Sequence, residues 1–187
     1  MPSNSPVFEQ AVSLLKKSAT LAQYGFGKEP DIGYFPSGRE RLGRIIFTKN
    51  EWKIRFPDRP EGYEGLYLHF ESERTDVLHL HCELYHRQGR EADHDQTKIR
   101  AMLDLKGAIG DQVRQAAARH GWAPKWRWSP WPKDLSDPAN LQVGKFKLGT
   151  EPDCQPESFV NAVVRIVAGV TPDIDPVVDS CRRAFGR

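Results

Sequence analysis

The stretch from residue 66 to residue 85 constrains the fold more than any other part of the chain. It reads LYLHFESERTDVLHLHCELY and contains two runs in which apolar and polar side chains alternate. Successive side chains of a β-strand point to opposite faces, so each run predicts a strand with one apolar and one polar face. The polar residues 71–76 between the runs are typical of a turn. We therefore expect a β-hairpin.

The two faces of this hairpin differ in chemistry. Leucines dominate one row of each strand, and the opposite row carries His69 in the first strand and His79 and His81 in the second. A pairing shift of one residue would move every leucine to the other face, so the assignment of faces is strongly constrained. We expect helices to bury the leucine face and the histidine face to be the wetter one.

Three histidines on one face allow two interpretations. Imidazoles are common ligands of divalent metal ions, and a His-x-His pair places two of them on the same side of a strand. His69, His79 and His81 would then be ligands, and Glu83 or His86 would complete the set. The alternative is an amphipathic sheet face, exposed or in contact with a partner, which needs no metal. No Cys-x-x-Cys or His-Glu-x-x-His motif supports the metal interpretation.

The composition bounds the class of protein. A chain of 187 residues, 39% hydrophobic and 28% charged, suits one domain with a continuous core. The net charge of +2 gives no bulk electrostatic case for nucleic-acid binding, so only a local basic patch would provide one. Three cysteines, no secretory signal and no run of about 18 apolar residues predict a reduced, cytoplasmic protein with no membrane partner.

Helical periodicity occurs in three further segments. It follows Ser5 and Pro6 up to about Tyr24, and it recurs over 96–120 and over 156–185. Two glycines, Gly107 and Gly110, predict a bend or interruption in the second segment. Asp175 followed by Pro176 predicts that a separate last helix begins within the third.

Alternating segments outside the hairpin predict further strands at 32–35, 44–47, 51–56, 125–128 and 141–148. The strands 44–47 and 51–56 would form a first hairpin that continues into the central one as a meander over 44–85, and the strands within 125–148 are rich in tryptophan. We therefore expect residues 1–187 to form a single α+β domain, an antiparallel sheet of four to six strands with helices on one face.

A short pattern of acids and a lysine suggests an enzyme. Pro30 and Asp31, followed after a gap by Glu51, Trp52 and Lys53, match the PD-(D/E)xK pattern of nucleases. Asp31 and Glu51 would hold a magnesium ion and Lys53 would activate the attacking water. The alternative is a chance match with a solvated Glu51, since 25 acids make acid-x-Lys triplets common.

A wider resemblance covers about residues 52–185. The succession of WKIRF, LYLHFE, a strand ending near Glu83, a helix start at Ile99 and Arg100, and TPDID resembles the C-terminal portion of bacterial PD-(D/E)xK-nuclease-family proteins. Catalytic residues of that family usually lie upstream of this portion. The resemblance implies an accessory binding domain, of bacterial or phage origin, from DNA defence or mobile-element biology.

Cations alternate with large apolar residues in three predicted strands. The residues concerned are Lys53, Arg55, Lys125, Trp126, Arg127, Trp128, Lys145 and Lys147. In one shared sheet the cations would form a basic face for phosphates, and an exposed tryptophan would stack on an unpaired base. Alternatively, the cations are ordinary solvated residues above core tryptophans, or the Trp-Pro-rich segment 121–133 docks a protein.

Two functional hypotheses from different classes follow. The first is a non-catalytic binding module without a cofactor, which engages a protein or nucleic-acid partner through the basic, tryptophan-rich strands. The second is a metal-dependent nuclease or other hydrolase. It would use Mg²⁺ at Asp31, Glu51 and Lys53, or Zn²⁺ at the histidines of the central hairpin.

Overall fold

The computed structural model describes residues 6–26, 32–35, 43–55, 65–85, 96–123, 140–147 and 155–185. This part of the chain contains a six-stranded antiparallel sheet and four α-helices, which confirms the predicted α+β class. The strands are β1 (Ile32–Phe35), β2 (Arg44–Phe47), β3 (Lys53–Arg55), β4 (Gly65–Arg74), β5 (Val77–Tyr85) and β6 (Asn140–Lys147). The helices are α1 (Pro6–Lys16), α2 (Ala19–Gln23), α3 (Gln96–Ala118) and α4 (Pro156–Phe185), with a short 3₁₀-helix η1 (Asn50–Trp52).

The central hairpin is confirmed as the pair β4 and β5. Leu68 lies opposite Cys82 and Phe70 lies opposite Leu80, and all four side chains are buried. The two strands extend further than the sequence predicts, so that the turn shrinks to residues 75–76. An irregularity between Glu71 and Arg74 accommodates the extra residues of β4.

The predicted hairpin of β2 with β3 is wrong. The sheet order is β1-β2-β4-β5-β6, and β3 also pairs with β4. Both short strands therefore lie beside the long β4, with Ile45 opposite Ser72 and Ile54 opposite Leu66. The 3₁₀-helix η1 connects β2 to β3, and its Trp52 is completely buried. The chain therefore continues in the same direction along β4 and does not reverse to pair β3 with β2.

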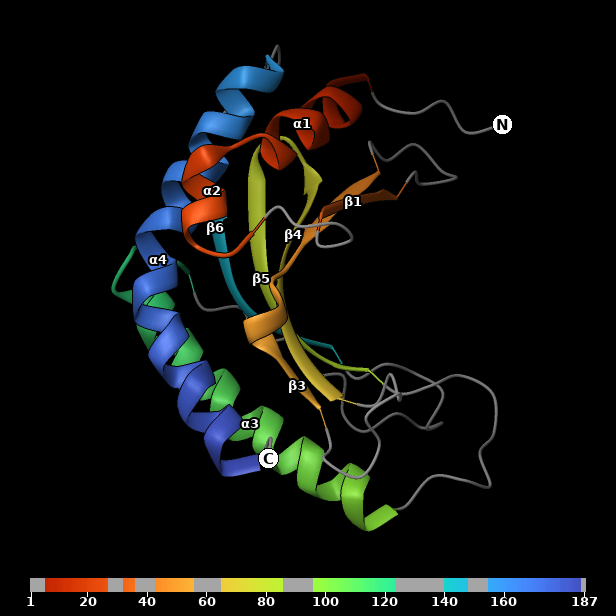
Figure 1. Ribbon diagram of the computed structural model, residues 1–187, viewed down its shortest axis with the longest axis vertical. Coiled ribbons are helices and arrows are strands. Elements are labelled where there is room, and N and C mark those ends of the chain that lie inside the picture. Colours follow the sequence, from red (N-terminus) through yellow and green to blue (C-terminus); the bar gives the residue numbers. More distant parts are fainter. Residues whose placement is uncertain are drawn as a thin grey trace.

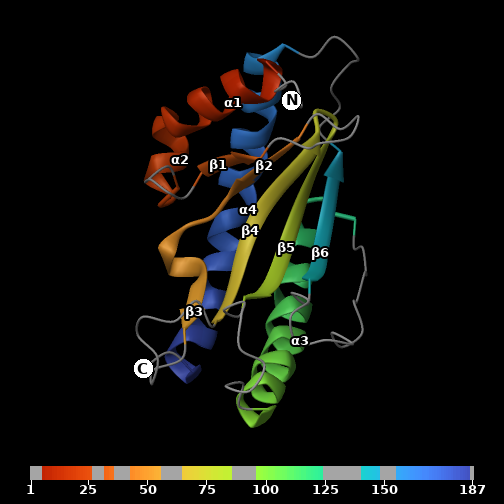
Figure 2. The same ribbon diagram turned by 90° about the vertical axis from the view of Figure 1, so that its right-hand side faces the viewer.

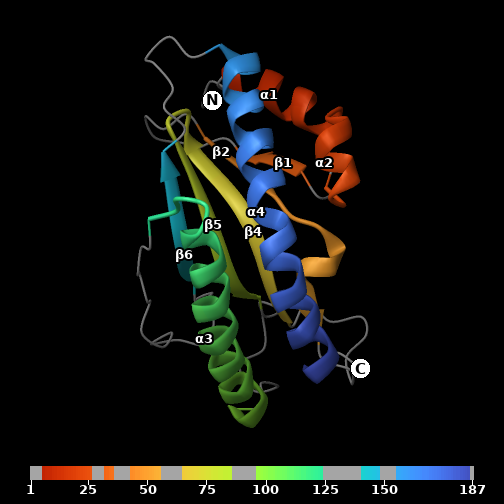
Figure 3. The ribbon, with the colours of Figure 1, turned by 90° about the vertical axis from the view of Figure 1, so that its left-hand side faces the viewer.

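The helices cover one face of the sheet. Figure 3 shows α3 and α4 side by side in front of the strands, and Figure 2 shows the same helices behind them. Helix α4 contributes a buried apolar stripe at helical spacing, composed of Val163, Val167, Val170, Ile174 and Val178. Helix α1 contacts α4 and β1, and its Phe8 packs against Phe159 of α4 with ring centroids 5.7 Å apart. The leucine-bearing face is therefore the core face, as predicted.

Three details of the predicted helices are wrong. The first helix is divided in two, because the chain turns at Ser18, whose hydroxyl oxygen accepts a hydrogen bond from the Leu21 N–H and caps α2. Helix α3 runs without interruption through Gly107 and Gly110. Helix α4 is a single helix of 30 residues that contains Pro172 and Pro176, because its apolar stripe continues past both prolines. No described helix is both long enough and apolar enough to cross a membrane.

An ion pair between a buried lysine and a partly exposed aspartate joins the segment between β2 and β3 to α4. The ammonium Nζ of Lys49 lies 2.7 Å from Asp175 Oδ1 and donates to the Tyr24 carbonyl at 2.9 Å. The indole Nε1 of Trp52 donates to the same carboxylate at 2.7 Å. Only 3% of Lys49 is exposed, so this residue is part of the core despite its charge.

Candidate metal centre

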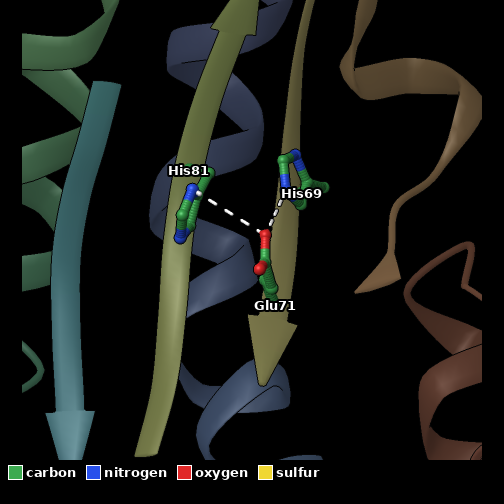
Figure 4. Close-up of side chains that lie close together, drawn as sticks. All are labelled: His69, Glu71 and His81. Atoms are coloured by element: carbon green, nitrogen blue, oxygen red, sulfur yellow. Dashed lines mark hydrogen bonds and ion pairs between the residues drawn. The ribbon is translucent and has the colours of Figure 1, made fainter. Parts of the chain in front are cut away.

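His69 and Glu71 of β4 and His81 of β5 form a cluster on the sheet. In the register of the hairpin His69 lies opposite His81, and Glu71 follows His69 by two residues on the same face. Figure 4 shows the three side chains on one side of the strands and α4 behind them. The cluster therefore occupies the face that is turned away from α4.

The donor atoms of the cluster converge. Glu71 Oε2 lies 3.3 Å from His69 Nε2 and 4.0 Å from His81 Nδ1, and one donor of each residue lies within 4.8 Å of the other two. Donors bound at about 2.1 Å around a tetrahedral ion stand about 3.4 Å apart. The 3.3 Å distance between Glu71 and His69 already matches, and small rotations of the two imidazole rings would bring the other separations, all within 4.8 Å, toward this value.

All three residues are buried. The exposed fractions are 0% for His69, 5% for Glu71 and 9% for His81, so the expectation of a wetter histidine face is wrong for this cluster. A buried carboxylate is unfavourable unless it is paired. Arg44 of β2 supplies a partner, since its Nε lies 3.4 Å from Glu71 Oε1. The two oxygens of Glu71 are thus divided, with Oε1 toward Arg44 and Oε2 toward the histidines.

The surroundings keep Glu71 ionised. Burial alone would raise the pKa of its carboxyl group, but the hydrogen bond with His69 and electrostatic attraction from His81, Arg44 and His69 outweigh burial and lower this pKa to about 2. A carboxyl group must be deprotonated to bind a metal ion. Glu71 is therefore a competent ligand at neutral pH.

The structure brings together two of the three predicted histidine ligands. The rings of His69 and His81 lie 5.1 Å apart between centroids. His79 lies opposite Glu71 in the register, 5.7 Å from the His81 ring, and does not belong to the group of converging donors. Glu71 is the member that sequence reasoning missed, although its position two residues after His69 on the same face was the available signal. The side chains of Glu83 and His86 lie outside the described residues.

The predicted magnesium site is only partly covered by the described chain. Asp31 lies outside it. Glu51 is an exposed residue of η1, and Lys53 begins β3 and donates a hydrogen bond to Asn50 Oδ1 at 3.0 Å. Glu51 and Lys53 therefore do not share a strand face, because the predicted strand 51–56 begins only at Lys53.

Only part of the predicted basic surface belongs to the described residues. Lys125, Trp126, Arg127 and Trp128 lie outside the described residues, which leaves Lys53 and Arg55 on β3 and Lys145 and Lys147 on β6. Lys53 lies opposite Tyr67 of β4, and Tyr67 lies opposite a residue of β5 that is paired with Asn140. Lys53 is therefore at the level of Asn140, the first residue of β6. Lys147 is the last residue of β6. A ligand that contacts both lysines would have to extend along the sheet, and the basic surface stays a prediction.

Comparisons with known proteins found no match to this chain among family models, curated proteins or solved structures. The resemblance to the C-terminal portion of PD-(D/E)xK-nuclease-family proteins therefore stays a prediction.

Proposed function

We propose that this protein is a metal-dependent hydrolase whose centre is a divalent transition-metal ion held by His69, Glu71 and His81. The observation that supports this proposal is the convergence of three donor atoms from two paired strands, one of them on a carboxylate kept ionised. Two imidazoles and one carboxylate suit zinc and similar ions, whereas Mg²⁺ and Ca²⁺ prefer oxygen ligands alone. The metal expected here is therefore Zn²⁺ and not Mg²⁺.

The number of donors supports the reaction class. Structural zinc sites use four protein ligands, whereas catalytic sites use three and leave a position for water. The converging group contains three donors within the described part of the chain. A bound ion lowers the pKa of its water and supplies hydroxide at neutral pH, which is what hydrolysis requires. The proposal follows the second of the two hypotheses, with Glu71 in place of His79. The binding module stays a prediction.

Metal binding can be tested on the purified protein. We expect about one equivalent of zinc per chain by elemental analysis after dialysis, and calorimetric titration should show much tighter binding of Zn²⁺ than of Mg²⁺. His81→Ala removes a donor atom and Glu71→Gln removes the negative charge of another, so the affinity for zinc should fall by roughly a hundredfold or more in each variant. The zinc-loaded protein should hydrolyse the activated ester p-nitrophenyl acetate faster than the Glu71→Gln variant.

His79→Ala is the matched control, because His79 lies on the same strand beside His81. Its affinity for zinc should equal that of the unmodified protein. An equal loss in His79→Ala and Glu71→Gln would contradict the assignment of these ligands. Failure to bind stoichiometric zinc would overturn the proposed function itself.

A further inference from the structure

Arg44 connects the candidate metal centre with the exposed surface. Its side chain is 46% exposed, whereas that of Glu71 is only 6% exposed. The guanidinium contacts Glu71 Oε1 through Nε at 3.4 Å and Glu73 Oε1 through Nη2 at 3.1 Å. A guanidinium carries five N–H donors, so these two contacts leave donors for a further acceptor. Arg44 is thus placed to bind both the metal ligand and a molecule arriving from solvent.

The charges around Arg44 favour an anionic ligand once an ion is bound. The divalent ion and Arg44 together carry three positive charges, and Glu71 and Glu73 carry two negative ones. Neutral histidine ligands add nothing. Before any anion binds, one positive charge therefore remains beside the buried side chains of His69, Glu71 and His81, where electrostatic attraction is screened less than in water.

The carboxylate of Glu71 shows the span that a bound anion would have to cover. Its Oε2 faces the histidine donors and its Oε1 faces Arg44, so one carboxylate spans the distance between those donors and the guanidinium. A second oxyanion has a similar separation between its oxygens. It would lie between the metal ligands and Arg44, with one oxygen on the guanidinium, whose planar fork suits carboxylate and phosphate, and the position for water on the ion would stay available.

We propose that the substrate of this centre presents an oxyanion, a phosphate or a carboxylate, that binds between the metal ion and Arg44. This inference rests on the proposed metal site and adds the chemical class of its substrate. It also assigns Arg44 a role in substrate binding besides its contact with Glu71.

The test uses zinc-loaded protein dialysed free of excess zinc, with inorganic phosphate and acetate as separate probes in calorimetric titrations. We expect at least one probe to bind, and the Arg44→Gln variant to bind it at least about tenfold more weakly, as expected for loss of a charge-assisted hydrogen bond. Arg44→Lys keeps the positive charge but loses the planar guanidinium, so its affinity for the probe should lie between those of the unmodified protein and Arg44→Gln. Zinc content is measured in each variant, because Arg44 also orients Glu71 and its loss weakens metal binding.

Arg74→Gln is the control, since Arg74 is an exposed arginine of the same hairpin that pairs with Asp76. It should bind the probe as tightly as the unmodified protein. Binding of phosphate alone or of acetate alone supports the inference and identifies the group. The inference is overturned if Arg44→Gln binds the probe as tightly as the unmodified protein, or if the unmodified protein binds the probe equally well without zinc. Neither result would contradict the metal site. If the unmodified protein binds no zinc, the proposed function fails first and the inference fails with it.

Discussion

At the scale of single residues, the pair of Lys49 and Asp175 shows how the core accommodates a charge. The Lys49 ammonium contacts the Tyr24 carbonyl oxygen and the Asp175 carboxylate, and the rings of Phe26 and Trp52 lie 5.4 and 5.3 Å from it. The two partners differ in access to water, since 4% of the Lys49 side chain but 36% of the Asp175 side chain is exposed. Removal of one partner should therefore have a different effect from removal of the other.

Asp175→Asn should destabilise the protein more than Lys49→Met, although it is the smaller change. The first substitution leaves a buried ammonium without its counter-charge, which costs about 3–5 kcal/mol. The second leaves a carboxylate that water can reach, and we expect a cost of about 1–3 kcal/mol. The free energies of unfolding can be measured in urea. A larger cost for Lys49→Met would contradict this account, and the double variant should cost less than the sum.

The sequence predicts which face of the hairpin a residue occupies but not what lies beside it. Alternation alone placed His69 and His81 on the polar face, away from the leucines. The alternation places Glu71 on the same face as His69, but it does not fix which residues of β5 lie opposite, so the approach of Glu71 to His81 could not be predicted. Lys49 and Asp175 are 126 positions apart, so no local pattern could have joined them.

At the scale of elements, α4 departs most from its sequence pattern. A proline inside a helix removes one backbone hydrogen bond and its ring crowds the carbonyl four residues earlier, which predicts a break. Here the apolar stripe of α4 lies against the sheet on both sides of the two prolines, while Pro172 and Pro176 themselves are exposed. Figure 1 shows α4 bowed around the sheet with its concave side inward. Tertiary packing therefore overrides the local preference.

Replacing these prolines should stabilise the protein. Pro172→Ala and Pro176→Ala each restore a backbone N–H donor to the helix. Part of this stabilisation is lost because alanine raises the conformational entropy of the unfolded chain. We therefore expect the free energy of unfolding in urea to rise by about 1–2 kcal/mol in each variant. Gly169→Ala is the comparison: a Cβ there meets open space, and about 0.5–1 kcal/mol is expected from helix propensity alone. Destabilisation by the proline variants alone would show that α4 needs their bend in order to pack.

Strand positions were easier to predict than strand pairing. The strands β1, β2 and β6 occur where alternation placed them, because a half-buried strand needs that pattern whatever its neighbour is. The partner of β3 depends on the length of β4, which at ten residues has room for both β2 and β3. A short polar segment between two strands therefore did not suffice to predict a hairpin.

At the scale of the whole molecule, the sheet separates the helix-covered core from the candidate metal centre. The leucine rows of β4 and β5 face the helices, and the histidine row of the same two strands holds the converging donors. Because those donors come together only when β4 pairs with β5 in the native register, the unfolded chain has no equivalent site. Metal binding should therefore be coupled to the stability of the fold.

Zinc should raise the melting temperature of the protein. At a free concentration of 100 times its dissociation constant, a ligand that binds only the native state contributes about 2.7 kcal/mol. For a chain of this length each kcal/mol corresponds to about 2–4 °C, so a rise of about 5–11 °C is expected in a thermal melt, reversed by EDTA. His79→Ala should show the same rise and Glu71→Gln almost none, each compared with its own metal-free melt. An equal rise in Glu71→Gln would mean that zinc binds elsewhere, because that variant lacks the charged donor at the centre of the cluster.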